Sequence, residues 1–363
     1  MACMNRLHQL RQTLPQNIKD NEGYDDLEFI VLNYNSHDDM EQWIKENMSE
    51  HILNGRLKYY KTTEPVSWSP SHAKNIAYKL ATGEIICGKA ADNFTGKNFA
   101  HYVNELFNKN TDIVLTPIDF HRSKPDYQPA NDVLGEVCIK KHDFLKIEGF
   151  DERMDRYGFE DYDLINRLEM IDVKRLLIED FTYLQYISHN NNERYALPTD
   201  DLRAIYINYH SPSTSEAIFL YKDSRFEKGV LVDNFTKDAA NCVYAYTPRK
   251  YHFEYSLNEP GWQTGTWINE NDHIKFSPDS SKKLIFIKQQ KDGQTILIDT
   301  DNSSIFYSIT DNKLIDTILT FKHFIYTRSI MEANLNGKNA VVNKGVFGKA
   351  TVYKNFQPQP ITV

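Results

Sequence analysis

Two adjacent carboxylates, Glu160 and Asp161, open a stretch of sequence with the apolar spacing of an α-helix. Apolar residues follow Asp161 by three, four and seven positions, so Asp161 shares the helix face that points toward the core. A carboxylate in such a place is partly desolvated, which raises its pKa and its strength as a base. Acids in a first helical turn also complement the positive end of the helix dipole. The pair therefore predicts either a general base with a companion acid or two acids that only stabilise a helix.

Continuous apolar runs predict the strands that must position these acids. Such runs are typical of strands buried on both faces of a sheet. They lie at residues 29–32, 57–60, 84–87, 112–118 and 175–178. Residues 71–80 keep i, i+3, i+4, i+7 apolar spacing and precede Gly83, which predicts a helix. Strands that alternate with helices indicate an α/β domain with a largely parallel sheet, which binds ligands at the carboxyl ends of its strands.

The pattern changes after about residue 211, where short strand-like segments are separated by turn signals. These segments lie at residues 217–221, 229–232, 242–246, 251–255, 284–288, 295–298 and 304–309. One helical pattern, at residues 314–321, interrupts them. With 363 residues the chain exceeds the usual size of a single domain. We therefore expect a helical or loose lead-in (residues 1–24), an α/β domain (25–210) and an all-β domain of sandwich or barrel type without an assigned function (211–363).

Residues 149–168 resemble the G-x-E-D region of inverting GT-A glycosyltransferases, in particular family 2 and β-1,4-galactosyltransferase-like enzymes. The segment reads Gly-Phe-Asp-Glu-Arg-Met-Asp-Arg-Tyr-Gly-Phe-Glu-Asp-Tyr-Asp-Leu-Ile-Asn-Arg-Leu, and the match continues through the final Arg-Leu. The resemblance covers roughly residues 25–200 and implies a GT-A fold, a Rossmann-like mixed and mostly parallel sheet with flanking helices. In that family the second acid removes a proton from the acceptor hydroxyl, and the first helps to hold the acceptor. Asp161 is thereby implied as the catalytic base and Glu160 as its companion.

Two further segments look like the donor-binding parts of the same family. Residues 29–36, Phe-Ile-Val-Leu-Asn-Tyr-Asn-Ser, resemble the first strand and the nucleotide-contacting turn after it. This resemblance implies that Asn33, Tyr34 and Asn35 lie near the base and ribose of the donor. The stretch Ser-His-Ala-Lys-Asn resembles the family's A-[RK]-N helix, and it implies that Lys74 meets the diphosphate or the base. The alternative is that Lys74 lies on a solvated helix face, as most lysines do.

The metal site is implied by residues 89–96, Lys-Ala-Ala-Asp-Asn-Phe-Thr-Gly, which stand where relatives carry D-x-D. Ala90 replaces the first acid, so Asp92 remains as the implied metal ligand, with Asn93 beside it on the donor side. His189 follows the last strand, where related enzymes supply a histidine to the metal. Because Mn²⁺ and Mg²⁺ take hard oxygen ligands and bridge phosphates, the resemblance implies one of these ions at Asp92 and His189. The change at Ala90 leaves open a weakened but working site or a loss of activity.

The resemblance implies a bacterial enzyme of surface polysaccharide synthesis. The reaction is inverting transfer of a hexose or N-acetylhexosamine from a UDP-sugar to a hydroxyl of a glycan or lipid-linked glycan. A second hypothesis is a catalytically impaired GT-A domain that binds a nucleotide sugar or glycan without turnover. Ala90 favours binding alone, whereas the Glu160–Asp161 pair and His189 favour the enzyme. Metal-dependent release of UDP would distinguish the two.

Charge and hydropathy limit the partners of the chain. A formal net charge of -8 gives no attraction to a phosphate backbone, which argues against nucleic acid as the main partner. No run approaches the roughly eighteen apolar residues that span a bilayer, and the N-terminus lacks the apolar stretch of a signal peptide. We expect a cytoplasmic protein without a transmembrane segment. Peripheral association with the inner face of the membrane is compatible with a lipid-linked acceptor.

Overall fold

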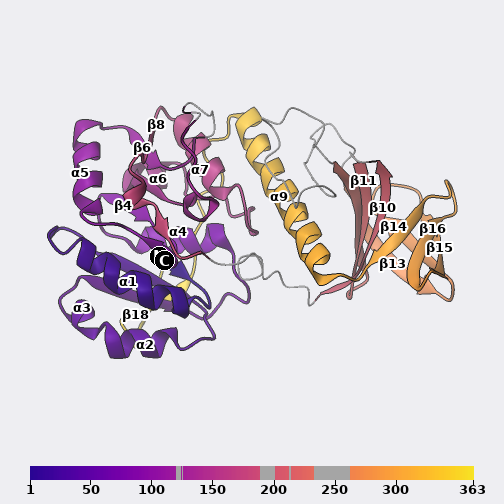
Figure 1. Cartoon of the computed structure of the whole chain (residues 1–363), viewed down its shortest axis with the longest axis horizontal. Helices are drawn as coiled ribbons and strands as arrows, with labels where there is room; N and C mark the ends of the chain where they lie inside the picture. Colours follow the sequence, from indigo (N-terminus) through magenta and orange to yellow (C-terminus); the bar gives the residue numbers. More distant parts are fainter. Residues whose placement is uncertain (120–123, 125, 189–200, 212–213, 233–261) are drawn as a thin grey trace. The chain divides into compact units, whose positions relative to one another are not determined.

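The computed structural model describes residues 1–119, 124, 126–188, 201–211, 214–232 and 262–363 (Figure 1). The chain divides into two compact units. The first unit comprises Met1–Asn190 and Ile330–Val363, and the second comprises Asn191–Ser329. The first unit contains the acids and the other candidate site residues that the structure describes.

The first unit contains a five-stranded sheet in which parallel and antiparallel pairs are mixed. Its strands, in spatial order, are β1 (Ala2–Cys3), β2 (Phe29–Tyr34), β3 (Leu57–Thr62), β18 (Thr351–Lys354) and β19 (Pro360–Thr362). The first three strands are parallel, and β18 joins β3 in antiparallel register. Val31 and Leu32 of β2 are fully buried, as the continuous apolar run predicts.

A second, four-stranded sheet carries the loops around the acids. Its order is β4 (Ile85–Gly88), β7 (Val137–Lys140), β6 (Ile113–Thr116) and β8 (Lys174–Leu177). Strands β6 and β8 are parallel, whereas β7 is antiparallel to both of its neighbours. A short antiparallel ladder joins β5 (Asn93–Phe94) to β9 (Gln185–Tyr186). The five apolar runs thus form strands as predicted, and β7 and β18 make the sheets more antiparallel than expected.

Helices pack around these sheets in Figure 1. They are α1 (Leu7–Asp20), α2 (Met40–Asn47), α3 (Ser49–Leu53), α4 (Pro70–Leu80), α5 (Phe99–Lys109), α6 (Lys141–Lys146) and α7 (Glu160–Glu169), with short 3-10 turns η1 (Asn131–Val133) and η2 (Phe181–Tyr183). Helix α4 begins with Pro70, whose fixed φ suits a first helical position. One apolar core joins β2, α4 and α7 through Leu32, Ile76 and Leu164, so this core sets the distance between the two helices.

Residues 1–24 belong to the first unit rather than forming a separate lead-in. Strand β1 pairs with β2, and Cys3, Leu10 and Leu14 share a core cluster with Val31. The inward face of α1 also carries fully buried polar residues, among them Thr13. A helix normally buries apolar residues on its inward face. Because polar residues take some of these positions in α1, its sequence lacks the regular apolar spacing that would predict a helix.

The second unit contains a closed antiparallel barrel. Its strands are β10 (Leu202–Ser211), β11 (Thr214–Tyr221), β12 (Arg225–Val232), β13 (Gln263–Glu270), β14 (His273–Pro278), β15 (Leu284–Lys291), β16 (Gln294–Asp299) and β17 (Ile305–Ile309). Phe226, Phe276, Phe286 and Phe306 contact one another edge-to-face in its interior. The predicted combination of a mixed α/β unit and a separate all-β unit is confirmed. The strands expected at 242–246 and 251–255 lie outside the described residues.

The second unit ends earlier than the expected range of 211–363. Residues 330–363 belong to the first unit, and the helix expected at 314–321 is longer, α9 (Asn312–Gly337). Strand β18 pairs with β3, and the ring of Phe356 stacks on Tyr59 at a centroid distance of 4.9 Å. Strand β18 has only four residues, and its partner lies about 290 positions earlier in the sequence. No local pattern could therefore predict which sheet it joins. No helix in the described ranges is both long and apolar enough to cross a membrane.

We predict that Val352→Ala destabilises the first unit, because Val352 is fully buried in its core. The expected loss is about 2 kcal/mol, from two methyl groups and the cavity that they leave. Hydrogen exchange of the β2 and β3 amides measures this loss. Val341→Ala, at a position 53% exposed, is the matched control and should leave exchange unchanged. Faster exchange confined to the barrel strands would contradict the assignment of β18 to the first unit.

Candidate active site

The acid pair opens α7 after a turn with left-handed backbone. Gly158 and Phe159 have φ values of 109° and 62°. The Gly158 N–H donates to Glu160 Oε2 at 3.0 Å, and the Asp163 N–H donates to the Phe159 carbonyl at 2.8 Å, which closes the first helical turn. The carboxylate of Glu160 thus satisfies one backbone donor ahead of the helix, as acids in first turns do. The turn fixes where α7 begins and therefore where its two acids lie.

Lys74 of α4 lies against both acids. Its ammonium nitrogen is 2.7 Å from Asp161 Oδ1 and 3.1 Å from Glu160 Oε1, and the lysine side chain is only 21% exposed. Burial disfavours the charged amine, but the two carboxylates outweigh burial and raise the pKa of Lys74 above its usual value. The ammonium therefore stays charged. The alternative of a solvated helix face for Lys74 is wrong.

Burial governs the protonation of Asp161. Desolvation raises the pKa of its carboxyl to about 6, while the attraction of Lys74 opposes the rise and the repulsion of Glu160 adds to it. A pKa near 6 gives a carboxylate that is ionised at neutral pH yet a stronger base than a solvated aspartate. Asp161 thus has the protonation behaviour expected of a general base.

Gly135 provides space beside the second oxygen of Asp161. A Cβ atom built on this glycine would lie 3.1 Å from Asp161 Oδ2 and 3.8 Å from the Lys74 nitrogen. Any side chain at position 135 would therefore crowd the carboxylate. Lys74 contacts Oδ1, so Oδ2 is the oxygen that faces Gly135. Nothing in the sequence around Gly135 indicates this close approach.

Asn75 ties α4 to the turn that precedes the acids. Its amide nitrogen donates to the Phe150 carbonyl at 2.9 Å, and its amide oxygen accepts from the Phe150 N–H at 2.8 Å. A Cβ atom on Gly149 would lie 2.4 Å from the Asn75 oxygen, so this close approach requires glycine. The contact holds Lys74, one residue earlier, against the acid pair.

A ladder of buried polar side chains on α1 holds the loop that contains Asp92. The Thr13 hydroxyl donates to the Ala91 carbonyl at 2.6 Å. Asn17 donates to the Asn93 carbonyl at 3.0 Å and accepts from the Thr95 N–H at 2.7 Å. Residues four apart share one helix face, so the ladder, which Asn21 continues, fixes the backbone on both sides of Asp92. Sequence reasoning missed this role because it treated α1 as a lead-in.

Asn93 and the two residues before β7, Gly135 and Glu136, connect the Asp92 loop to the acid pair. The Asn93 amide donates to Glu136 Oε1 at 3.0 Å, and Glu136 also forms a buried ion pair with Lys89. Burial raises the pKa of Glu136 to about 7, Lys89 opposes this rise, and the charge of Asp92 adds to it. Glu136 follows Gly135, so one short segment touches both the Asp92 loop and Asp161. Glu136 and Lys89 are site residues that the sequence did not reveal.

The expected metal ligands are partly outside the described residues. The Ile187 N–H donates to the Asp92 carbonyl at 2.8 Å, so the chain approaching residue 189 runs beside Asp92. His189 itself lies outside the described residues. Within the described part of the chain, no cluster of three His, Cys, Asp or Glu side chains is arranged to hold a metal. Of the two predicted ligands the structure describes Asp92, whose carboxylate is the kind of oxygen ligand that Mn²⁺ and Mg²⁺ take.

The three residues expected near the nucleotide differ in their surroundings. Asn33 is buried, and its amide donates to the Tyr59 hydroxyl and accepts from the backbone of Ser36. Asn35 adopts a left-handed φ of 55° and donates to the Pro65 carbonyl at 2.8 Å. Both side chains shape the turn after β2, and their amides are engaged inside the protein.

Tyr34 instead lines a cavity of about 350 Å³ at the carboxyl end of β2. Glu64, His72 and Arg156 also line it, and the Tyr34 hydroxyl is 2.7 Å from His72 Nδ1. His72 and Lys74 lie on the same helix, so the cavity and the acid pair are both reached from α4. A cleft of this size with a few polar groups is typical of a small-molecule site.

We predict that Lys74→Met raises the pKa of Asp161 by about 1–3 units, because an opposite charge is removed from hydrogen-bond distance. Carboxyl ¹³C NMR measures the titration, with the Asp161 resonance assigned by its loss in Asp161→Asn. Lys79→Met, on the same helix, is the control and should leave the titration unchanged. An Asp161 pKa that stays near its original value in Lys74→Met would show that the ion pair does not control the base.

Comparison with known proteins finds a family similar to the region that contains these groups. Residues 1–163 match the model of glycosyl transferase family 2, so the match includes Asp92, Glu160 and Asp161. No curated protein matches the chain. One similar solved structure is the mannosyltransferase PcManGT from Pyrobaculum calidifontis in complex with GDP-Man and Mn²⁺, with 19% identity and a TM-score of 0.40. Another is TarS 1–349 from S. aureus, with 15% identity and a TM-score of 0.41.

Neither structural likeness extends over a whole chain. The first covers 49% of this chain and 53% of the mannosyltransferase, and the second covers 54% of this chain and 60% of TarS. The family match is likewise confined to the N-terminal part of the sequence. It does not reach the barrel or residues 330–363. The similarity to glycosyl transferase family 2 thus concerns residues 1–163, which make up less than half of the chain.

Proposed function

We propose that the chain is an inverting glycosyltransferase that transfers a hexose or N-acetylhexosamine from a UDP-sugar to an acceptor hydroxyl. The observation that carries the proposal is the buried carboxylate of Asp161, held by Lys74 on one oxygen and beside the space at Gly135 on the other. The family 2 match supports sugar transfer as the reaction class. The closer likeness to β-1,4-galactosyltransferase-like enzymes rests on the sequence pattern at residues 149–168.

In the proposed reaction Asp161 Oδ2 accepts the proton of the acceptor hydroxyl. The hydroxyl oxygen forms a bond to the anomeric carbon of the donor, from the face opposite the nucleotide. The bond from that carbon to the phosphate oxygen breaks, and its electron pair leaves with the nucleoside diphosphate. Base catalysis of this kind contributes roughly 10²–10⁴-fold to a rate. Glu160, fixed by Gly158 and Lys74, would orient the acceptor beside the base.

The donor would bind from the cavity at Tyr34 toward Lys74. Glu64, Ser69 and His72 line this cavity and offer hydrogen bonds to a base and ribose. Asn33 and Asn35 would act by shaping this turn. Lys74, whose ammonium pairs with Glu160 and Asp161, is the proposed contact of the diphosphate or the base.

Asp92, with Asn93 shaping its loop, and His189 would hold the proposed Mn²⁺ or Mg²⁺. Bound to the diphosphate, such an ion neutralises the charge that develops on the leaving group. The α1 ladder keeps the backbone on either side of Asp92 in place.

The acceptor and the cellular setting are proposed from the family resemblance. A glycan or lipid-linked glycan of a bacterial surface polysaccharide is the acceptor that the resemblance favours. Such a reaction would take place in the cytoplasm, with peripheral association at the membrane when the acceptor is lipid-linked. The net charge of -8 gives no support to nucleic acid as a partner.

The second candidate function is binding of a nucleotide sugar or glycan without turnover. Ala90 favours it, because the D-x-D pattern has lost its first acid. A panel of nucleotide sugars tested with and without Mn²⁺ separates the two functions. Release of UDP, even slow hydrolysis without acceptor, supports the enzyme, whereas saturable metal-linked binding without release supports the binding protein.

We predict that Asp161→Asn lowers the rate of transfer by roughly 10²–10⁴-fold, because the base is lost. Donor affinity should stay close to the wild-type value, since the cavity at Tyr34 is untouched. Initial rates of UDP release and calorimetric titration with UDP and Mn²⁺ measure the two quantities. Asp172→Asn makes the same chemical change at an exposed position of the same unit and should retain full activity. Loss of both rate and donor affinity in Asp161→Asn would contradict the assigned role.

We predict that Asp92→Ala removes the Mn²⁺ dependence of donor binding. The variant loses the carboxylate proposed to contact the ion, while the backbone hydrogen bonds of the loop remain. Calorimetric titration with UDP at several Mn²⁺ concentrations measures the dependence. Asp112→Ala, an exposed position after α5, is the control. A Mn²⁺ dependence equal to that of the wild type would remove Asp92 from the metal site.

A further inference from the structure

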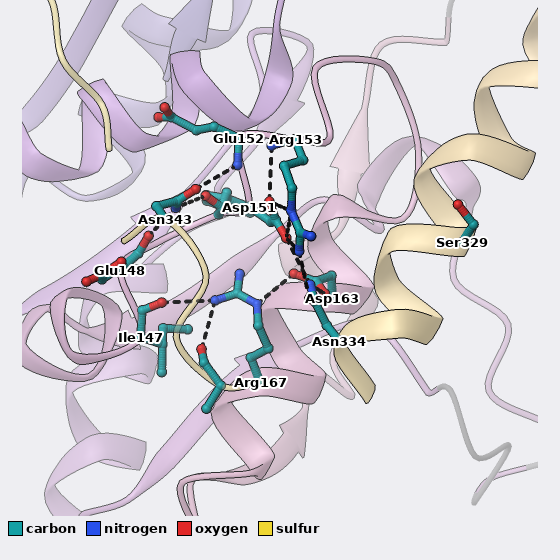
Figure 2. Close-up of polar contacts among 12 residues, drawn as sticks. Ile147, Glu148, Asp151, Glu152, Arg153, Asp163, Arg167, Ser329, Asn334 and Asn343 are labelled. Carbon is teal, nitrogen blue, oxygen red and sulfur yellow. Dashed lines mark hydrogen bonds and ion pairs between the residues drawn. The ribbon is translucent and has the colours of Figure 1, made fainter. Parts of the chain in front are cut away.

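Asn334, in the last turns of α9, lies between two buried carboxylates of the first unit (Figure 2). Its amide nitrogen donates one hydrogen bond to Asp151 Oδ2 and one to Asp163 Oδ1, each 2.9 Å long. All three side chains are at most 1% exposed. One neutral amide therefore joins two acids that water cannot reach, and it comes from a segment 171 positions beyond the nearer acid.

Each of the two acids also has its own arginine. Arg153 contacts both oxygens of Asp151 and donates to the Asn334 amide oxygen at 2.7 Å. Arg167 donates to Asp163 Oδ2 at 2.7 Å and, on its other nitrogens, to backbone carbonyls that include Gly149. The side chains form a continuous row, visible in Figure 2, with Asn334 at its centre. The two hydrogens of the Asn334 amide nitrogen can donate to the two acids while the amide oxygen accepts from Arg153.

The two acids bound by Asn334 begin and end the segment that carries the proposed base. Asp151 follows the Gly149 turn, and Asp163 lies in the first turn of α7, two residues after Asp161. Side chains two residues apart on a helix point in different directions. The hydrogen bond to Asp163 therefore fixes the rotation of the first turn of α7, while the side chain of Asp161 points to another side of the helix. By holding both ends together, Asn334 reduces the number of conformations open to residues 151–163.

We propose that Asn334 is a positioning residue for Asp161, acting through Asp151 and Asp163. We call this three-residue arrangement the Asn334 clasp. The inference rests on the proposed function, since it takes Asp161 as the base of sugar transfer. It extends the site to a residue far beyond the family 2 match, which ends at residue 163.

Asn334→Leu tests the clasp, because it keeps the approximate size of the side chain and removes both donors. The rate of transfer at saturating substrates should fall about 10- to 100-fold, the effect of displacing a catalytic group. The affinity for UDP with Mn²⁺ should stay close to the wild-type value, since Tyr34 and Asp92 lie on other segments. Hydrogen exchange should accelerate in residues 151–163 and remain unchanged in residues 91–100. The matched control is Asn336→Leu, an exposed position in the same part of α9, which should behave as the wild type.

Asn334→Ser covers the case in which Asn334→Leu does not fold, because the smaller side chain fits the same space and is too short to join both acids. Its rate of transfer should also fall, with faster exchange in residues 151–163. Wild-type rate and exchange in a folded Asn334→Leu or Asn334→Ser would overturn the clasp. A parallel loss of rate, UDP affinity and thermal stability would show a merely structural role and would also overturn it.

The exchange measurement separates failure of the clasp from failure of the proposed function. If the wild-type protein releases no UDP from any donor while Asn334→Leu loosens residues 151–163, the proposed function is wrong and the physical clasp stands. If the wild type is active and neither rate nor exchange responds to Asn334→Leu, the clasp is wrong and the function stands.

Discussion

A buried ammonium held between two carboxylates is the interaction on which the site depends. Lys74, Glu160 and Asp161 come from two helices that share one apolar core, and removing Lys74 would leave two buried carboxylates side by side without a counter-charge. The same burial that makes this arrangement costly gives Asp161 a pKa suited to accepting a proton at neutral pH. The core between α4 and α7 must therefore be rigid enough to keep the three groups at hydrogen-bond distance.

Polar side chains, more than sheet hydrogen bonds, hold the loops of the site. The α1 ladder, centred on Asn17, fixes the loop of Asp92, and the Asn334 clasp fixes the segment before Asp161. Asn75 does the same for the turn at Phe150. In each case an amide supplies both a donor and an acceptor, which lets one side chain satisfy two backbone or carboxylate groups of an irregular loop. Buried asparagines thus hold irregular loops in place where the backbone cannot form the hydrogen bonds of a sheet.

Local patterns predicted the elements of this fold better than its long-range contacts. The apolar runs that became β2 and β4 and the helical spacing of residues 71–80 were sufficient, because strand and helix periods are local properties. The acid pair was recognisable from a contiguous motif, although its catalytic role stays a prediction. The contacts of Lys74 with Glu160, of Lys89 with Glu136 and of Asn334 with Asp163 join positions 47 to 171 apart. No periodicity in one sequence reports which distant polar residues will meet.

The first unit is built from two pieces of chain, with the barrel inserted between them. During synthesis residues 1–190 emerge first, yet the edge of β3 stays uncovered until residues 351–354 have been made and have paired with it. An unpaired strand edge and an incomplete core invite wrong partners in a nascent chain. The first unit is therefore completed only after residues 351–354 have been made, and the barrel, whose described strands are consecutive in the chain, can close before it. Synthesis of the first unit begins before that of the barrel, but its completion comes later.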